Sequence, residues 1–140
     1  MATGKIEVNQ EIPSVTKSIT QEKINLFEAC GILDRENIHN SPEMAMQKLG
    51  TTFPIASGRM SVAFASESLR KFFGAEVFNH SGTLNLKFLR PVKEGDTITV
   101  HGTVSRQEKV EKGTIVTVDV FCENQNQDKT AVGAATAIVP

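Results

Sequence analysis

Hydrophobic and polar positions follow a helical period in one long segment near the middle of the chain. Between residues 58 and 73, apolar side chains such as Met60, Leu69 and Phe73 recur every three or four positions. Such spacing predicts an amphipathic helix with one buried face, and Gly74 is a natural place for it to end. Small residues along the same face favour close packing of this helix against a sheet.

After Gly74 the period changes from helical to alternating, and the rest of the chain is predicted to be strands. Alternating or continuous runs of β-branched and aromatic residues predict a strand, and clusters of Gly, Asn and charged residues predict the turns between strands. The expected strands cover residues 84–88, 98–104, 115–122 and 130–139, with turns at 94–96, 111–113 and 123–128.

The first 50 residues predict a short strand and two short helices. A strand is expected at residues 14–19 and a helix at 21–29, which ends by Gly31. Ser41 and Pro42 form a typical helix start, a cap followed by proline at the first helical position, and that helix ends by Gly50. The stretch 32–40 has neither period and is expected to be an ordered loop.

This order of elements, helices first and then antiparallel strands, predicts an α+β fold in which the long helix fills the concave face of the sheet. The 140 residues suit a single domain spanning 1–140, since no linker, repeat or low-complexity run divides them. No segment is apolar enough to span a bilayer, and residues 1–14 lack the apolar core of a signal peptide. We therefore expect a cytoplasmic protein with no membrane contact, whose two cysteines are free thiols.

Charge excludes one large class of partner. The formal net charge is −1 and the two signs are well mixed, so the chain lacks the basic surface of a nucleic-acid-binding protein. His80 and His101 have no ligand partners at metal spacing, and His101 is expected to face solvent on a strand. We expect no metal and no nucleic acid, and a small molecule as the partner.

Three stretches together resemble the MaoC-like dehydratases and R-specific enoyl-CoA hydratases, a branch of the hot-dog fold. Residues 34–39, DRENIH, correspond to a family pattern of Asp, any residue, Asn, Pro, an apolar residue and His. Residues 54–58, PIASG, precede the long helix and correspond to Pro-Ile, any residue, His-Gly. Residues 88–100 are similar to the family's strand–turn–strand. The chain departs from the pattern at Glu36 and Asn37, and at Ser57, where His is usual.

The resemblance implies a hot-dog fold of about five strands, a dimer, and a lyase that hydrates or dehydrates acyl thioesters in fatty acid metabolism. It needs no cofactor, because CoA or an acyl carrier belongs to the substrate. Two alternatives stay open: a hot-dog acyl-CoA thioesterase, and a non-catalytic acyl-thioester binding or structural subunit. One fold hosts many functions, so the fold alone does not choose between them. The unpaired edges of a strand-rich half independently favour a homodimer joined edge to edge.

Asp34 and His39 are the predicted acid–base pair. A separation of five residues places them ~140° apart on a straight helix, so they share a site only if the segment is a folded loop. A carboxylate and an imidazole around one water can remove a proton as water attacks Cβ and deliver one to Cα. The simple alternative is that Asp34 is a loop acid and that His39 caps the helix beginning at Ser41. Glu36 is either a second acid near the site or a solvated loop charge.

Four residues around the start of the long helix complete the candidate site. The Gly58 N–H, at the positive end of the helix, is the expected donor to the thioester oxygen as the enolate develops. Ser57, Arg59 and Ser66 are candidate substrate-binding residues, the last on the resemblance alone. Each has a simpler interpretation: Gly58 as a helix-entry glycine, Ser66 as a packing residue, and Arg59 as a side chain in solvent. Otherwise, Arg59 reaches an anion on the substrate.

Overall fold

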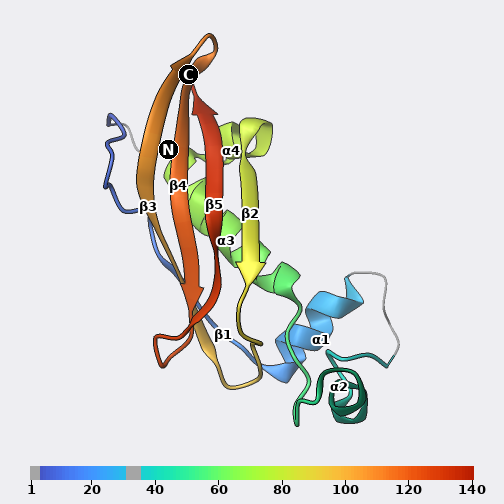
Figure 1. Ribbon diagram of the computed structural model, residues 1–140. Helices are drawn as coiled ribbons and strands as arrows, with labels where there is room; N and C mark the ends of the chain where they lie inside the picture. Colours follow the sequence, from blue (N-terminus) through green and yellow to red (C-terminus); the bar gives the residue numbers. More distant parts are fainter. Residues whose placement is uncertain (1–3, 31–35) are drawn as a thin grey trace.

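A computed structural model describes residues 4–30 and 36–140 of the chain. In this part the strands form a five-stranded antiparallel sheet with the order β1-β3-β4-β5-β2. The sheet curves along α3, which lies across one of its faces (Figure 1). The strands are β1 (Val15–Ser18), β2 (Thr83–Phe88), β3 (Thr97–Val110), β4 (Gly113–Glu123) and β5 (Lys129–Val139), and the helices are α1 (Gln21–Ala29), α2 (Pro42–Leu49), α3 (Gly58–Phe73) and α4 (Ala75–Ser81).

The predicted α+β architecture, with its long helix on the concave face of the sheet, is confirmed. The three long strands β3, β4 and β5 run antiparallel in sequence order, and β1 and β2 pair with the outer sides of β3 and β5. Half-buried and buried residues alternate along the first half of β3, so one face of the sheet is turned toward α3. A bulge between Val104 and Arg106 shifts the register in the second half of β3.

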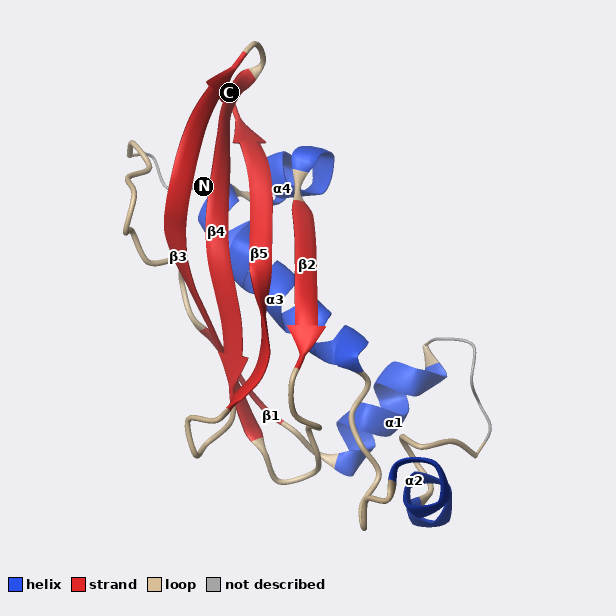
Figure 2. Cartoon of the chain, in the orientation of Figure 1, coloured by secondary structure: helices blue, strands red, loops and turns tan. Residues whose placement is uncertain are grey.

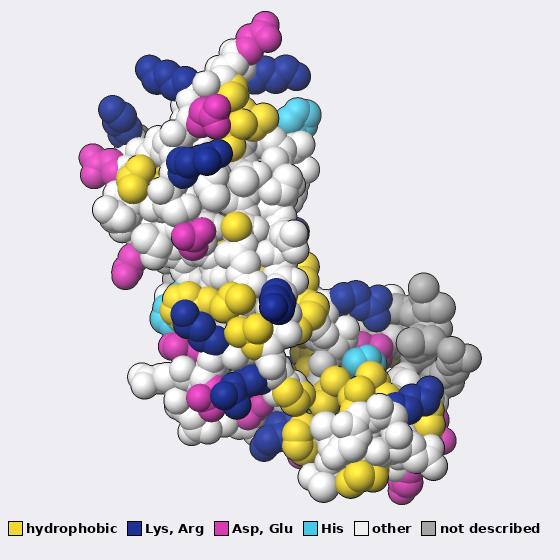
Figure 3. Space-filling model, viewed as in Figure 1, with side chains coloured by type: hydrophobic (Ala, Val, Ile, Leu, Met, Phe, Trp, Pro, Cys, Tyr) yellow, Lys and Arg dark blue, Asp and Glu magenta, His cyan; other side chains and the backbone are white. Residues whose placement is uncertain are grey.

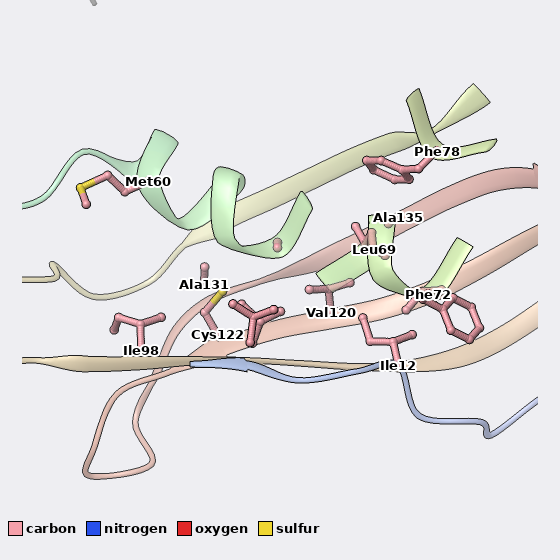
Figure 4. Packing of buried hydrophobic residues seen from close by; sticks show 14 of the residues in the cluster. Ile12, Met60, Leu69, Phe72, Phe78, Ile98, Val120, Cys122, Ala131 and Ala135 are labelled. Atoms are coloured by element: carbon pink, nitrogen blue, oxygen red, sulfur yellow. The ribbon is translucent and has the colours of Figure 1, made fainter. Parts of the chain in front are cut away.

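The core lies between α3 and this inner face. Leu69 and Phe73 on the helix are fully buried, as are Ile98, Val100 and Cys122 on the strands. Figure 4 shows the side chains of α3 directed toward the residues of β3, β4 and β5. The apolar spacing that predicted the helix therefore also marks its buried face.

The helices α1 and α2 lie beside the start of α3, away from the long strands (Figure 2). Thr20 caps α1 by accepting a hydrogen bond from the Lys23 N–H at 3.1 Å. Gly50 ends α2 in the left-handed conformation with φ +70°, which glycine adopts without strain. Both helices occupy the positions predicted from sequence.

The prediction that everything after Gly74 is strand is wrong for residues 75–81, which form α4. Gly74, with φ +87°, ends α3, and the chain turns there and starts a second helix. Phe78 on this helix is buried and stacks on Phe73, with ring centroids 6.3 Å apart. The residues Val77 and Phe78 suit a strand in isolation, so this tertiary contact overrides their local preference.

The two edges of the sheet differ in how they are covered. Residues 9–12 run along the β3 side, where the Asn9 and Ile12 N–H groups donate to the carbonyls of Val104 and Gly102 at 2.8 and 3.0 Å. On the other side, the outer edge of β2 has no strand partner among the described residues. No helix in the described ranges is long and apolar enough to cross a bilayer.

Candidate active site

His39 lies in the turn before α2, and the segment leading into α3 fixes its ring. The Nδ1 atom lies 2.8 Å from the carbonyl oxygen of Ile55. Because a carbonyl oxygen can only accept, Nδ1 carries the proton and donates this bond. In the neutral ring, Nε2 then has the free lone pair. This tautomer is the one that a general base requires.

Hydrogen bonds also fix the backbone of this turn on both sides. The His39 N–H donates to Asn37 Oδ1 at 2.7 Å, and the His39 carbonyl accepts from Gln21 Nε2 of α1 at 2.9 Å. The Ile55 N–H donates to the carbonyl of Ile38 at 3.1 Å. The turn is thus attached both to α1 and to the segment before α3, as an ordered loop requires.

The alternative in which His39 caps the second helix is wrong. Ser41 is the cap of α2, because its Oγ accepts from the Met44 N–H at 3.2 Å. The Ser41 hydroxyl lies 2.7 Å from Glu36 Oε1, to which it donates. Glu36 therefore has a structural partner at the start of α2, a role that neither of its two sequence-based interpretations included.

Asp34, the predicted partner of His39, lies outside the described residues. Of the predicted acid–base pair, the structure places His39, and the role of Asp34 stays a prediction from the sequence. The described part of the loop begins at Glu36.

Gly58 opens α3 and has the features expected of a backbone donor. Its N–H has no acceptor among residues 4–30 and 36–140, and it lies at the N-terminus of a helix of 16 residues, where the dipole is positive. Ser57 is the N-cap, and its Oγ accepts from the Arg59 N–H at 3.2 Å. A Cβ atom at position 58 would lie 2.6 Å from the ring of Phe88, so this ring packs directly on the glycine.

A groove of about 530 Å³ runs past the start of α3. Its walls are mainly apolar and come from three places: the end of α2, the segment that leads into α3, and the end of β2 with the loop that follows. Figure 3 shows apolar side chains gathered at this junction, where the surface is hollowed. The lining includes Leu49, Ile55, Gly58, Arg59, Phe88 and Arg90. The groove thus combines an apolar surface, a backbone donor and two guanidinium groups.

An ion pair beside this groove was not among the sequence-based predictions. The side chain of Glu28 on α1 is only 3% exposed, and neither carboxylate oxygen has a hydrogen-bond partner among the described residues. Arg59 Nη2 lies 3.8 Å from Glu28 Oε2, and Arg59 Nε lies 3.4 Å from Ser57 Oγ. Arg59 is 62% exposed, so it faces solvent and is nevertheless held on one side by a buried carboxylate.

A signal for this pair was present in the helical spacing of α1. Glu28 follows the fully buried Ile24 by four positions, so an acid lies on the apolar face of the helix. An acid at such a position is almost never fully buried unless it is paired. Arg59, a cation in the first turn of α3, is the second half of the signal.

The remaining candidates lie away from the groove or are chemically inert. Ser66 is half-buried on α3 and is not among the described residues that line the groove. Both cysteines are free, and burial raises the pKa of the Cys122 thiol to about 11, so this thiol stays protonated. No group of three or more His, Cys, Asp or Glu side chains in the described ranges could hold a metal.

The strand histidine is less exposed to solvent than its alternation predicted. The Nε2 atom of His101 lies 2.8 Å from Glu123 Oε1, and its ring stacks on Phe121 with centroids 4.9 Å apart. Lys129 Nζ lies 4.7 Å from the same phenyl ring. The first two contacts join β3 to β4 and the third joins β4 to β5, and none of these residues lines the groove.

Comparisons with known proteins agree with the overall fold. Residues 5–126 match the model of a family described as the MaoC like domain. The solved structure of the R-hydratase PhaJ1 from Pseudomonas aeruginosa, in the unliganded form, is 28% identical with a TM-score of 0.75, and the match covers 96% of this chain and 83% of that one. A search of curated protein sequences finds no match.

Two further solved structures share the fold at lower identity. An (R)-hydratase from A. caviae, involved in PHA biosynthesis, is 22% identical with a TM-score of 0.75, over 96% of this chain and 98% of that chain. A MaoC-like dehydratase from Rhodospirillum rubrum is 21% identical with a TM-score of 0.78, over 96% and 92%. The hot-dog fold predicted from the sequence is therefore confirmed.

Proposed function

Because the chain belongs to the MaoC-like domain family, we propose that it is a hydro-lyase that adds water to, or removes it from, the α,β carbons of an acyl thioester. The observation that carries the proposal is the orientation of His39, whose Nδ1 donates to Ile55 and whose Nε2 is left as a base. Ile55 is three residues before Gly58, so the base and the backbone donor are attached to the same short segment.

In the hydration direction, the oxygen of water attacks Cβ of the enoyl thioester while His39 Nε2 accepts a proton from that water. The electron pair of the double bond moves toward the carbonyl, and the thioester oxygen becomes an enolate oxygen. The Gly58 N–H donates to this oxygen, where a fixed donor is worth most. Protonation at Cα completes the addition. We assign this step to the Asp34–His39 pair on the family resemblance, and dehydration is the reverse.

The substrate in this proposal is an acyl group joined to CoA or to an acyl carrier. The apolar walls of the groove suit the acyl chain, and the backbone donor at Gly58 suits the thioester carbonyl. The reaction is a redox-neutral addition, so the thioester carrier is the only cofactor-like group that it requires.

The test is a parallel measurement of enoyl absorbance and free thiol with crotonyl-CoA and longer enoyl-CoA substrates. A hydratase removes the enoyl absorbance and releases no thiol. The His39→Ala variant should lose 10²–10⁴-fold in turnover, as general acid–base groups typically contribute. His80→Ala is the matched control, because His80 is exposed on α4 and does not line the groove.

Two results would contradict the proposed reaction, and a third would contradict the role of His39. Release of free thiol as the thioester is hydrolysed would show that the protein is a thioesterase. Binding of the thioester with neither reaction would select a non-catalytic acyl-thioester subunit. Near-normal hydration by His39→Ala would reject His39 as the base even if the reaction class is right.

We further propose that the active form is a homodimer joined at the β2 edges. This edge has no partner strand in the described chain, and it ends at Phe88 and Leu89, which are 52% and 47% exposed. An isologous pairing of the two edges would cover both of these side chains. Sedimentation at micromolar concentration should give the mass of a dimer, and a monomer under those conditions would reject this assembly.

A further inference from the structure

We propose that Arg59 binds a carboxylate on the acyl group, so that the preferred substrates are thioesters of acids with a second carboxyl group. This inference rests on the proposed function, because it uses the thioester position at Gly58. It goes beyond that function by naming the class of acyl chain. The evidence is the position of Arg59, the way in which its guanidinium is held, and the charges around the groove.

Arg59 is placed where a group on the acyl chain can reach it. It follows Gly58 directly and lines the same groove. Side chains in a helix tilt toward its N-terminus, so the guanidinium extends past Ser57, ahead of α3 rather than along it. The bond from Arg59 Nε to Ser57 Oγ, at 3.4 Å, agrees with this direction. The cation therefore lies on the side of the helix end where the thioester is proposed to bind.

The guanidinium is held on two sides and open on the third. Nε faces Ser57 Oγ, and Nη2 lies 3.8 Å from Glu28 Oε2. The Nη1 group has no acceptor among the described residues. An arginine held in this way loses little rotamer freedom when it binds a planar anion, which is why fixed guanidinium groups suit carboxylates. Glu28 is thus a positioning residue for Arg59.

The charge balance of the groove favours a negative ligand. Glu28 offsets one positive charge, but Arg90 also lines the groove and has no ion pair in the described part of the chain. The N-terminus of α3 adds roughly half a positive charge. Among the described residues, Glu28 is thus paired with Arg59 alone, while Arg90 and the helix end have no counter-charge and lie at a groove whose other walls are mainly apolar.

Stability alone does not explain this arrangement. A cation in the first turn of a helix opposes the dipole, and a buried carboxylate without hydrogen bonds is unfavourable even beside a cation. Both unfavourable features occur together, next to the proposed backbone donor. Features that are unfavourable for stability and lie together in this way are expected at functional sites.

The experiment compares two acyl groups of equal length, one with a terminal carboxylate. Values of kcat/KM are measured for glutaconyl-CoA and pent-2-enoyl-CoA with the parent protein, Arg59→Met and Arg59→Lys. The ratio of the two values should fall about ten- to hundredfold in Arg59→Met, as expected for a hydrogen bond to a charged group. Arg59→Lys should keep part of the ratio, because it keeps the charge. An equal effect of Arg59→Met on both substrates would overturn the proposal.

Two controls guard against other causes of the same loss. Lys71→Met removes one positive charge from the other end of α3 and should leave the ratio unchanged, since Lys71 does not line the groove. Arg59→Met leaves Glu28 buried without its cation. The measurement is therefore repeated with a double variant, Glu28→Leu combined with Arg59→Met, in which an apolar pair replaces the ion pair. The ratio should fall in this double variant as well.

The source of the anion is tested with shorter thioesters. The N-acetylcysteamine thioesters of the same two acids lack the phosphates of CoA, and the ratio should still depend on Arg59. If Arg59 instead binds a CoA phosphate, Arg59→Met should lower kcat/KM equally for both CoA thioesters and leave their N-acetylcysteamine counterparts unchanged, and this pattern would overturn the proposal.

A binding measurement separates this inference from the proposed function. Calorimetry with the saturated glutaryl-CoA and pentanoyl-CoA requires no turnover. Tighter, Arg59-dependent binding of glutaryl-CoA without any hydration activity would reject the proposed function and keep the carboxylate site. Hydration of pent-2-enoyl-CoA with no Arg59-dependent preference for the carboxylated compound in either assay would keep the proposed function and reject the carboxylate site.

Discussion

The two ends of α3 differ in how well their burial and charge favour a stable helix. At the C-terminal end, Leu69, Phe72 and Phe73 are buried, and the basic Arg70 and Lys71 lie in the last turn, where cations favour the helix dipole. Phe73 also contacts the ring of Phe72, with centroids 4.9 Å apart. At this end the burial of the apolar residues and the charge of the basic ones both favour the helix.

At the N-terminal end, several of the same rules are broken. The first turn has no acid and contains the cation Arg59, and the buried carboxylate that faces this cation has no hydrogen-bond partner among residues 4–30 and 36–140. Phe88, which packs on Gly58, is half-exposed. The same helix thus stabilises the fold at one end and presents unsatisfied donors and a charge at the other. Substitutions at the C-terminal end should therefore affect the stability of the fold, and substitutions at the N-terminal end should affect the reaction.

The largest effect on the stable end is expected from Leu69→Ala. Leu69 is fully buried, so the variant should lose about 2.7–5 kcal/mol in the free energy of unfolding, from lost transfer energy and the cavity left behind. Urea unfolding followed by far-UV circular dichroism measures this loss. Leu26→Ala on the exposed side of α1, where the side chain is 66% exposed, is the control and should stay within about 0.5 kcal/mol. A loss below 1 kcal/mol for Leu69→Ala would mean that this end is not the stable one.

The counterpart at the other end is Gly58→Val. A side chain here should block the thioester or turn the amide away, which raises KM and lowers kcat together, with a loss of about 2.7–4 kcal/mol in transition-state stabilisation if the donor is lost. Ala63→Val, on the exposed face of the same helix, controls for the general effect of a β-branched side chain on this helix. Stability should change little, because a Cβ at 58 meets only the ring of Phe88, which is half-exposed and can move.

Phe88 also allows the cause of that loss to be separated. If the new side chain acts only by displacing the ring of Phe88, then the addition of Phe88→Ala should restore activity to the level of Phe88→Ala alone. If Gly58 binds the thioester oxygen through its N–H, Phe88→Ala should leave the loss in place. Restoration would therefore reject the donor role and keep the packing role of the glycine.

Prediction from the sequence succeeded where the residue types in a short segment decide its structure by themselves. The apolar period of residues 58–73 and the Ser41-Pro42 start are local signals, and the structure follows both. It failed at α4 and at Glu28, where the deciding partners lie elsewhere in the chain. The stacking of Phe78 on Phe73 and the contact of Glu28 with Arg59 bring together residues that no local period relates.

For the site, the sequence predicted residue types better than their contacts. His39 was identified by its place in a motif, but its tautomer depends on the carbonyl of Ile55, 16 positions away. Ser57, predicted to contact substrate, lines the groove and also accepts two hydrogen bonds from Arg59, which the sequence did not indicate. The interpretation of Arg59 as a side chain in solvent is correct for most of its surface and misses the carboxylate behind it.

A smaller effect is expected when the ion pair is dismantled in steps. Arg59→Met leaves the Glu28 carboxylate buried and unpaired, which should reduce the free energy of unfolding by about 1–3 kcal/mol. Losses at fully buried pairs are larger, but Arg59 is 62% exposed. Glu28→Leu combined with Arg59→Met should recover most of this loss, because an apolar pair needs no desolvated charge. Urea unfolding of both variants measures the recovery. No difference between them would mean that the carboxylate is not held by Arg59.

The smallest effect concerns Cys122, beneath α3 in the core. Burial raises the pKa of this thiol from 9.0 to about 11, so above pH 9 the unfolded chain loses the proton while the folded chain keeps it. The unfolded state then binds fewer protons, and stability falls as pH rises from 9 to 11. At about 1.4 kcal/mol per pH unit, roughly 1 kcal/mol is lost between pH 8 and pH 10. Cys122→Val should remove this part of the alkaline loss, whereas Cys30→Val, at an exposed thiol, should not. Parallel stability curves for the parent and Cys122→Val over this range would show that the thiol reaches water in the folded protein.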